Sequence, residues 1–317
     1  MGRYVLRRCA AALVTLLLLS MLISVLMALT PSSPGRRIAG PFAAPGVAKA
    51  IDHELGTDRA LPVRYGKWIS KAASGDLGVS YSKKRPVADI VRTALFKSSK
   101  LAIFAFLVVV PLSIAGGVVS ALRRGRLLDR SISVIGLSGI AIPEFVSGIL
   151  LIYVFAIHWH VLPSQANPPA GAAVVTQLRY FLLPVTTLVI VLFGYIARMA
   201  RAGTIDALEA DYTRTATLKG LPRRLVLRRH VLRNGLMPTI AVIATQLGYL
   251  LGGLVAVERA FNYPGLGSII LDGVRNKDFP LVQSAVLVVG TLYLVATLLA
   301  DVLFAALNPR IRLEGGA

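Results

Sequence analysis

Long runs of apolar residues alternate with short polar segments along this chain. A helix needs about 20 mostly apolar residues to cross roughly 30 Å of hydrocarbon. Six stretches reach or approach that length, and they predict spanning helices at Cys9–Leu29, Leu101–Leu122, Ile132–Ile157, Phe181–Ala197, Leu236–Val257 and Leu281–Leu307. The pattern therefore predicts an all-α membrane protein with six transmembrane helices.

Composition agrees with this interpretation. Hydrophobic residues make up 55% of the 317 positions and charged residues only 16%, with a mean hydropathy of +0.69. The first apolar run follows three arginines, as in a signal peptide, but it is longer than a cleaved hydrophobic segment and "MALTP" is a poor cleavage site. We expect it to remain as an uncleaved helix.

The net charge of +20 is unevenly distributed between the two sides of the predicted helices. Eighteen Lys and Arg residues fall on one side, in the two termini and in the loops after the second and fourth spans, and four fall in the short loops opposite. Because short basic loops resist translocation, both termini are predicted to be cytoplasmic.

The long segment Pro31–Lys100 carries thirteen basic residues and still has to lie outside, which long loops tolerate. Within it, Tyr65, Trp68, Ile69 and Ala72 recur at helical spacing, and a turn-rich "SGDLGVSYS" follows. We expect a small external subdomain here. The predicted division is 1–30 for the N-terminal tail and first helix, 31–98 for the external subdomain, 99–307 for a five-helix core and 308–317 for a cytoplasmic tail.

Sequence signatures of catalysis and nucleotide binding are absent. The chain contains no GxxxxGK[ST], GxSxG or HExxH motif, and its single cysteine, Cys9, cannot form an internal disulfide. His158 and His160 lack a third ligand at metal-binding spacing. We therefore predict a protein that is not an enzyme and that binds no metal or cofactor itself.

Glu144 is the most conspicuous charge inside a predicted span. It follows Pro143, which removes a backbone hydrogen bond and kinks a helix, and a charge in hydrocarbon has to be paired, solvated or neutralised. A structural role, with the carboxylate paired or reaching the interface, competes with a functional one. Polar residues that are candidates for lining a translocation path are Glu144, Tyr195, Gln246 and Tyr249.

The segment 201–235 is the most basic of the short loops, and it reads as two helices joined by a corner. "IDALEADYTRTATLKG" has no internal breaker and ends at Gly220, a residue type favoured just past a helix end. Pro222 suits the first turn of a second helix. In that helix Leu221, Leu225, Leu232 and Leu236 would share one face, with arginines over the rest. The segment predicts a protruding elbow suited to contact with a cytoplasmic protein.

The stretch "DYTRTATLKGL" resembles the EAA loop of permeases from ATP-binding-cassette (ABC) importers. The usual pattern is Glu-Ala-Ala, three residues and Gly, and only Ala216 and Gly220 meet it strictly. Further similarity to the peptide branch lies in "RPVADIVRTAL", "IPEFVSGILL", "RRLVLRRHVLRNGLMP", "VERAFNYPGLGSIILDGV" and "NPRIRL". The resemblance covers nearly the whole chain and is specific to the first of the two permeases in dipeptide, oligopeptide and nickel importers. The segment after the first span departs from the pattern.

This resemblance implies a type I importer permease fold and a set of partners. These would be a second, similar permease forming a heterodimer, two cytoplasmic ATPase subunits that bind ATP and Mg, and an extracytoplasmic peptide-binding protein. Residues that would contact the ATPase, carried over from the EAA loop, are Asp211, Tyr212, Arg214, Thr215, Ala216, Lys219 and Gly220. The implied function is import of di- or oligopeptides.

Three alternatives stay open at this stage. Nickel chelate or glutathione could replace peptide as the substrate within the same family. An ion-coupled secondary transporter would also lack nucleotide motifs, although it should show an inverted repeat or more charges at mid-membrane. Nucleic-acid binding by the basic loop is disfavoured, because Tyr212 is its sole aromatic residue and topology already explains the arginines.

Overall fold

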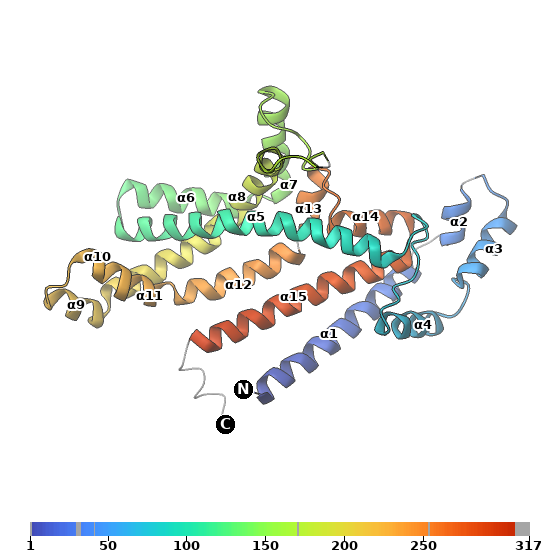
Figure 1. Ribbon diagram of the computed structural model, residues 1–317, viewed down its shortest axis with the longest axis horizontal. Coiled ribbons are helices and arrows are strands. Elements are labelled where there is room, and N and C mark those ends of the chain that lie inside the picture. The colour runs from blue at the N-terminus through green and yellow to red at the C-terminus, as the bar shows by residue number, and fades with distance from the viewer. Residues whose placement is uncertain (1, 30–32, 41, 170, 253, 308–317) are drawn as a thin grey trace. The chain divides into compact units, whose positions relative to one another are not determined.

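The computed structural model describes residues 2–29, 33–40, 42–169, 171–252 and 254–307. The only β pairing in this part of the chain is an isolated bridge between Val79 and Pro86, so the predicted all-α fold is confirmed (Figure 1). The predicted tail at 308–317 lies outside the described residues. The helices, in chain order, are α1 (Gly2–Leu29), α2 (Pro34–Ala39), α3 (Pro45–Leu55), α4 (Leu61–Ala73), α5 (Val87–Leu122), α6 (Leu127–Ala141), α7 (Glu144–Leu151), the π-helix η1 (Ile152–His158), α8 (Val174–Glu209), α9 (Asp211–Leu218), α10 (Arg223–Val226), the π-helix η2 (Leu227–Val231), α11 (Leu232–Gly235), α12 (Met237–Gly252), α13 (Val255–Ala260), α14 (Leu266–Asn276) and α15 (Phe279–Leu307).

Four of the described helices are long and apolar enough to cross a membrane: α1, α5, α8 and α15. The third predicted span, Ile132–Ile157, is wrong as a single helix, because α6 and the helix of α7 and η1 meet at an angle of 105°. Pro143 is the physical cause: its missing N–H and its ring end α6 just before it. The kink expected from the sequence is thus a full break.

The fifth predicted span is also shorter than expected. Leu236–Val257 was expected to form one helix, whereas α12 ends at Gly252 and α13 begins at Val255. The sequence "LLGGLV" places two glycines at that point, and glycine weakens a helix interior. In the other direction, α5 begins at Val87 and α8 continues to Glu209. Neither extension contains a proline, so each helix runs beyond its apolar core.

The chain divides into two compact units. The first contains Met1–Ser99, Gly252–Val255 and Pro264–Leu294. Its core joins the start of α5 to α14 and α15 through eight buried side chains: Val87, Ile90, Val91, Ala94, Leu266, Ile269, Leu281 and Ala285. Helix α1 packs along α15, where a Cβ on Gly290 would lie 3.0 Å from Leu19 and 3.2 Å from Leu16.

The external subdomain predicted from the sequence contributes three short helices to this unit. The predicted helix around Tyr65–Ala72 is confirmed as α4. Asp52 on α3 accepts hydrogen bonds from the Gly35 N–H at 2.8 Å and the Thr57 hydroxyl at 2.8 Å, which holds α2 against α3. The following turn is anchored by Asp278, whose carboxylate accepts from the Ser80 hydroxyl at 2.5 Å and the Ser82 hydroxyl at 2.7 Å.

The second unit contains Lys100–Leu251, Ala256–Tyr263 and Val295–Ala317. Its centre is the contact of α5 and α6 with α8, which depends on small residues. A Cβ added to Gly117 on α5 would lie 2.4 Å from the Ala197 carbonyl oxygen, and one added to Gly194 on α8 would lie 2.2 Å from the Gly136 carbonyl oxygen on α6. Without side chains at these positions the helix backbones approach closely, as is common between membrane helices.

Candidate functional site

The C-terminal end of α8 leads into the segment predicted as an elbow, and we use that name for residues 210–235. Ala210 adopts an extended conformation, with φ −71° and ψ 145°, and so turns the chain out of α8 before α9 begins at Asp211. Helix α9 has eight residues and is followed by the corner and by the helical stretch of α10, η2 and α11 (Figure 1). The predicted arrangement of helix, corner and second helix is confirmed, but the single helix expected over "IDALEADYTRTATLKG" is wrong, because it is divided at Ala210 into the end of α8 and α9.

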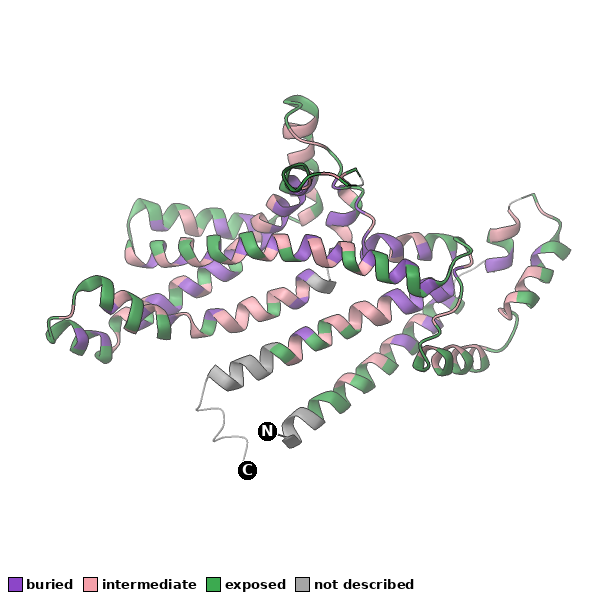
Figure 2. Cartoon of the chain, viewed as in Figure 1, coloured by how far each residue is buried: buried purple, intermediate pink, exposed green. Residues whose placement is uncertain are grey.

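The elbow has a small hydrophobic core of its own. We call α9 the first arm of the elbow, and the stretch of α10, η2 and α11 its second arm. Ala207 at the end of α8 packs with Ala216 on the first arm and with Val226 and Val231 on the second arm. The Thr213 hydroxyl, also buried, donates to the Ala207 carbonyl at 2.7 Å. These contacts tie α9 to the last turns of α8, so that the elbow follows α8 as one body. Buried and exposed positions alternate along both arms in Figure 2.

The corner depends on the conformation of Gly220. Its φ is +77°, a region that side chains with a Cβ adopt at a cost of roughly 1–2 kcal/mol. The Gly220 N–H donates to Thr217 O at 3.0 Å and the Leu221 N–H to Ala216 O at 3.4 Å. These bonds close the end of α9 as left-handed helix ends do. Pro222 immediately precedes α10.

The second arm differs from the sequence prediction in its buried face. The expected stripe was Leu221, Leu225, Leu232 and Leu236, but Leu225 is exposed and the buried residues are Val226 and Val231. Val226 and Val231 are five residues apart, and the wider turn of η2 between them brings that spacing onto one face. A regular period of 3.6 residues cannot anticipate such a spacing.

The elbow is attached to the membrane helix through two glycines. A Cβ on Gly203 of α8 would lie 2.0 Å from the Gly235 carbonyl oxygen at the end of α11. The reverse contact, from a Cβ on Gly235 to the Gly203 carbonyl oxygen, would be 2.6 Å. Backbone therefore lies directly against backbone where the second arm crosses α8.

Ion pairs attach the same end of α8 to the turn between α5 and α6. The Arg201 guanidinium donates to both carboxylate oxygens of Asp129, at 2.7 Å and 2.8 Å, and Asp129 is buried. Asp129 also accepts from the Ser120 hydroxyl and, at 2.9 Å, from the Gly125 N–H. Near the elbow, Arg124 and Glu209 form an exposed pair at 2.5 Å. In the sequence, Arg201 was counted only among the basic residues that set the orientation in the membrane. Its bidentate contact with Asp129, 72 residues away along the chain, was not predicted.

The exposed surface of α9 carries most of the residues carried over from the EAA loop. The exposed members are Asp211, Tyr212, Arg214, Thr215, Lys219 and Gly220. Ala216 is different, because it is buried in the core of the elbow and its small side chain serves internal packing. Leu218 was missed: it is 79% exposed at the last position of α9. A leucine flanked by Thr217 and Lys219 on a polar helix was the available signal, since a large exposed apolar side chain marks a contact surface.

The candidate path residues are partly brought together. The Tyr249 hydroxyl on α12 donates to the Glu144 carboxylate at 3.2 Å. The carboxylate that directly follows the helix break at Pro143 therefore has a hydrogen-bond partner. Gln246 lies one turn before Tyr249 on α12 and is half-buried, and Tyr195 on α8 is half-exposed. Within the described residues, no group of three His, Cys, Asp or Glu side chains has the arrangement needed to hold a metal ion.

Comparisons with known proteins agree across the length of the chain. Residues 113–313 match the family described as "Binding-protein-dependent transport system inner membrane component", and residues 1–102 match its N-terminal companion family. The chain is 36% identical over 312 residues to "Glutathione transport system permease protein GsiC" of Escherichia coli (strain K12), covering 98% of this chain and 99% of that protein. It is 33% identical to "Probable peptide ABC transporter permease protein y4tP" of Sinorhizobium fredii, covering 98% and 100%. A solved amino acid ABC transporter has a TM-score of 0.49 at 19% identity, covering 70% of this chain and 94% of that one.

Proposed function

Because the chain belongs to the family of binding-protein-dependent transport system inner membrane components, and is an ABC permease of the peptide and glutathione type, we propose that it couples ATP hydrolysis to the import of di- and oligopeptides through the elbow. Membership establishes a multi-pass inner-membrane transport component that is not an enzyme. The family also implies ATPase subunits and a binding protein as partners. This membership favours an ATP-driven importer over the ion-coupled secondary transporter that the sequence alone left open.

The observation that carries the proposal is the attachment of α9. Its inner residues are held by the elbow core, and its outer face presents charged, hydroxyl and apolar groups together. An apolar side chain rimmed by polar groups, with Leu218 beside Lys219 and Thr215, has the character of a protein-protein contact. We assign this face to the groove of an ATPase subunit.

A movement of the ATPase subunits would then be transmitted to the membrane helices, because a flexible loop would not absorb it. The Gly203–Gly235 contact joins the elbow to α8, and the Asp129–Arg201 pair joins α8 to the start of α6. A displacement of α9 therefore has to move α8 as well. In this mechanism ATP binding favours one of two permease conformations through differential contact with α9, which is a population shift.

The assembly and topology belong to the same proposal. A second, similar permease would complete the path as a heterodimer, and both termini would be cytoplasmic, with residues 31–98 on the opposite side. The basic residues of the elbow, which number seven between Asp211 and Asn234, support that orientation. ATP and Mg would be bound by the ATPase subunits and not by this chain.

Peptide is proposed over glutathione and nickel chelate as the substrate. One relative is named for peptide transport and another for glutathione, and glutathione is itself a tripeptide, so both names describe small peptides. Uptake of a labelled dipeptide by cells that contain the complete transporter, with competition by excess dipeptide, glutathione or nickel chelate, distinguishes them. Uptake of labelled glutathione without uptake of labelled dipeptide would reassign the substrate.

The corner glycine offers a direct test of coupling. We expect Gly220→Asp to leave membrane insertion intact while transport falls and ATP hydrolysis by the assembled complex continues. No atom lies within 4 Å of a Cβ built on Gly220, so a side chain there meets the partner before it meets this chain. Gly171→Asp is the matched control, because Gly171 has a similar φ of +75° and equally open surroundings in the loop before α8.

Gly220→Asn separates charge from shape, since asparagine tolerates positive φ better than other side chains. Normal peptide uptake by Gly220→Asp would argue directly against an ATPase contact at this corner. Equal loss in Gly171→Asp would attribute the effect to backbone strain. A requirement for ion gradients in place of ATP would contradict the proposed energy source.

A further inference from the structure

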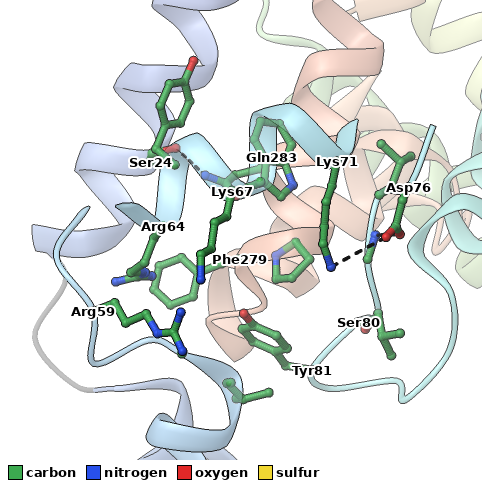
Figure 3. A pocket seen from close by; sticks show the side chains of 18 of the residues that line it. Ser24, Arg59, Arg64, Lys67, Lys71, Asp76, Ser80, Tyr81, Phe279 and Gln283 are labelled. Atoms are coloured by element: carbon green, nitrogen blue, oxygen red, sulfur yellow. Dashed lines mark hydrogen bonds and ion pairs between the residues drawn. The ribbon is translucent and has the colours of Figure 1, made fainter. Parts of the chain in front are cut away.

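A cavity of about 480 Å³ lies within the unit that contains α1 to α4. Its walls are α4 and the turn 76–84, and its floor is formed by Ser24 near the end of α1 and by Phe279, Pro280 and Gln283 at the start of α15 (Figure 3). None of the candidate coupling or path residues lines it. The cavity is therefore a separate feature of the fold that the proposed function leaves unexplained.

Basic side chains dominate the lining. Five line the cavity, namely Arg59, Arg64, Lys67, Lys71 and Lys84, against two acidic ones, Glu54 and Asp76. Lys71 pairs with Asp76 at 3.9 Å. Arg59 and Lys67 form no ion pair within the described residues, although the pKa of the neighbouring Asp58 carboxyl is lowered by its hydrogen bond with His53 and, in part, by the charge of Arg59. Figure 3 shows the ends of Arg59, Arg64 and Lys67 gathered around Phe279, while Lys71 and Asp76 lie on the opposite wall.

Uncharged donors add to this positive surface. The indole Nε1 of Trp68 is buried and has no hydrogen-bond acceptor in the described part of the chain. Burial raises the pKa of Tyr81 to about 12, so its phenol remains protonated at neutral pH. A buried donor without an acceptor costs about 1–3 kcal/mol. Together with the unpaired cations, Trp68 indicates a ligand that carries negative charge and accepts hydrogen bonds.

The position of the cavity indicates where that ligand comes from. Its floor consists of the adjoining ends of two membrane-spanning helices, and α4 above it combines Tyr65 and Trp68 with Lys67 and Lys71, a composition typical of the membrane interface. The Tyr65 hydroxyl lies 2.8 Å from the Ser20 hydroxyl, which fixes α4 beside α1. The cavity therefore lies at headgroup level.

An apolar surface continues from the cavity toward the membrane interior. On α1, Leu13 and Leu17 fall on the same side as Ser20 and Ser24, within about 60° of one another on a helix of 3.6 residues per turn. Both leucines are exposed, at 61% and 43%, whereas Ser20 and Ser24 are buried. A molecule with an anionic head in the cavity and an apolar chain on this stripe would match both surfaces.

We propose that the cavity binds the phosphodiester headgroup of an anionic phospholipid, with an acyl chain along Leu13 and Leu17. Arg59 and Lys67 neutralise the phosphate and the Trp68 indole donates to one of its oxygens. Free inorganic phosphate has the same charge chemistry but would leave the leucine stripe unused. An acidic segment of a partner protein would also leave it unused, which is why the lipid is favoured.

The test exploits the tryptophan content, since the chain has two tryptophans, Trp68 and Trp159. In the full-length chain carrying Trp159→Phe, all tryptophan fluorescence reports on the cavity. The purified protein in mixed micelles is titrated with brominated phosphatidylglycerol, brominated phosphatidylcholine or inorganic phosphate, because bromine quenches the indole on contact. We expect quenching at lower mole fractions of phosphatidylglycerol than of phosphatidylcholine, and no effect of millimolar phosphate on that quenching.

Charge variants on the same background give the second measurement. Arg59→Gln and Lys67→Gln should each reduce the preference for phosphatidylglycerol about fivefold, the effect of one basic side chain near an anionic membrane surface. Lys49→Gln and Lys83→Gln, exposed and outside the cavity, should leave the preference unchanged. Retained monodisperse elution of every variant shows that the fold survives.

Four outcomes would overturn the inference. Equal quenching by both lipids would mean nonspecific apolar contact. Reversal of quenching by inorganic phosphate would mean a free-phosphate site. A preference that persists in the Arg59→Gln/Lys67→Gln double variant would mean that the lining charges do not bind the headgroup. Protection of Trp68 from quenching only when the extracytoplasmic binding protein is added would assign the cavity to that protein.

Discussion

The contact between Gly203 and Gly235 allows the rigidity of the elbow to be tested with a single methyl group. In Gly203→Ala the new Cβ would lie 2.0 Å from the Gly235 carbonyl oxygen, whereas ordinary contact begins at 3.4 Å. The obstacle is backbone, so no side-chain rotation relieves it, and α8 and α11 have to separate by about 1.4 Å. Overpacking of this kind costs about 1–3 kcal/mol, partly offset by the gain of about 1 kcal/mol from replacing glycine in a helix.

We expect two measurable consequences of Gly203→Ala. The detergent-solubilised chain should lose its monodisperse state at a temperature a few degrees lower than the unmodified chain. The reconstituted complex should hydrolyse ATP with weaker stimulation by the substrate-loaded binding protein, because α9 no longer moves rigidly with α8. Gly66→Ala is the control: Gly66 lies inside α4 with no atom within 4 Å of a built Cβ, so the same methyl group should be neutral or stabilising. If Gly203→Ala behaved like Gly66→Ala in both assays, the elbow would be loosely attached and the lever mechanism would fail.

Three other predictions concern the supports of the two units. Arg201→Met should lower the free energy of unfolding by about 3 kcal/mol in thermal denaturation, because it leaves buried Asp129 without its ion partner; adding Asp129→Asn should recover much of that loss, and no recovery would mean that the charge pair is not the cause. Asp278→Ala should accelerate trypsin cleavage after Lys83 and Lys84 several-fold, since the carboxylate anchors Ser80 and Ser82. Exposed Asp58→Ala should not, and equal rates would show that other contacts hold the turn. The free energy of unfolding should fall by up to about 2–3 kcal/mol between pH 10 and pH 12, because the pKa of Tyr81 is raised to about 12 in the fold and the unfolded chain releases that proton first. In Tyr81→Phe the thermal midpoint should depend less on pH over this range, and an unchanged dependence would refute the assignment to Tyr81.

The features that the sequence predicted well are those set by local pattern. Apolar runs located α1, α5, α8 and α15, and the spacing of Tyr65, Trp68 and Ala72 located α4, because amphipathic periodicity is a property of neighbouring residues. Gly220 was predicted as a corner for the same reason: its positive φ is a local requirement. Glu144 was identified by its charge, although its partner Tyr249 lies 105 residues away.

What the sequence did not predict depends on contacts between distant segments or on irregular helix geometry. The inner face of the elbow is formed by Val226 and Val231 in place of the expected leucine stripe. The wider turn of η2 places these two valines on one face, and no residue type marks a π-turn. The bidentate contact of Arg201 with Asp129 was hidden because a basic residue near a membrane helix has an adequate topological explanation. Ala216 satisfied the family pattern and was assigned to the ATPase contact, yet the fold uses it inside the elbow.

The burial of Ala216 changes which part of the elbow can transmit force. If Ala216 faced the ATPase, the contact would be a bare helix face, and the charged residues around it would serve mainly to exclude water. Since Ala216 is buried, its size determines how closely α9 packs on α8. The exposed contact that we propose for the ATPase then consists of Leu218, Tyr212 and Arg214 between them. Ala216→Val should therefore impair coupling by displacing α9 from Val226 and Val231, with a fall in thermal stability. Leu218→Ala should weaken ATPase association while stability stays unchanged, because that side chain is 79% exposed. The two effects are separated by measuring, for each variant, both its melting temperature and the amount of ATPase that copurifies with it. A Leu218→Ala chain with a lowered melting temperature, or an Ala216→Val chain that is fully stable but loses the ATPase, would reverse the roles derived for these two residues.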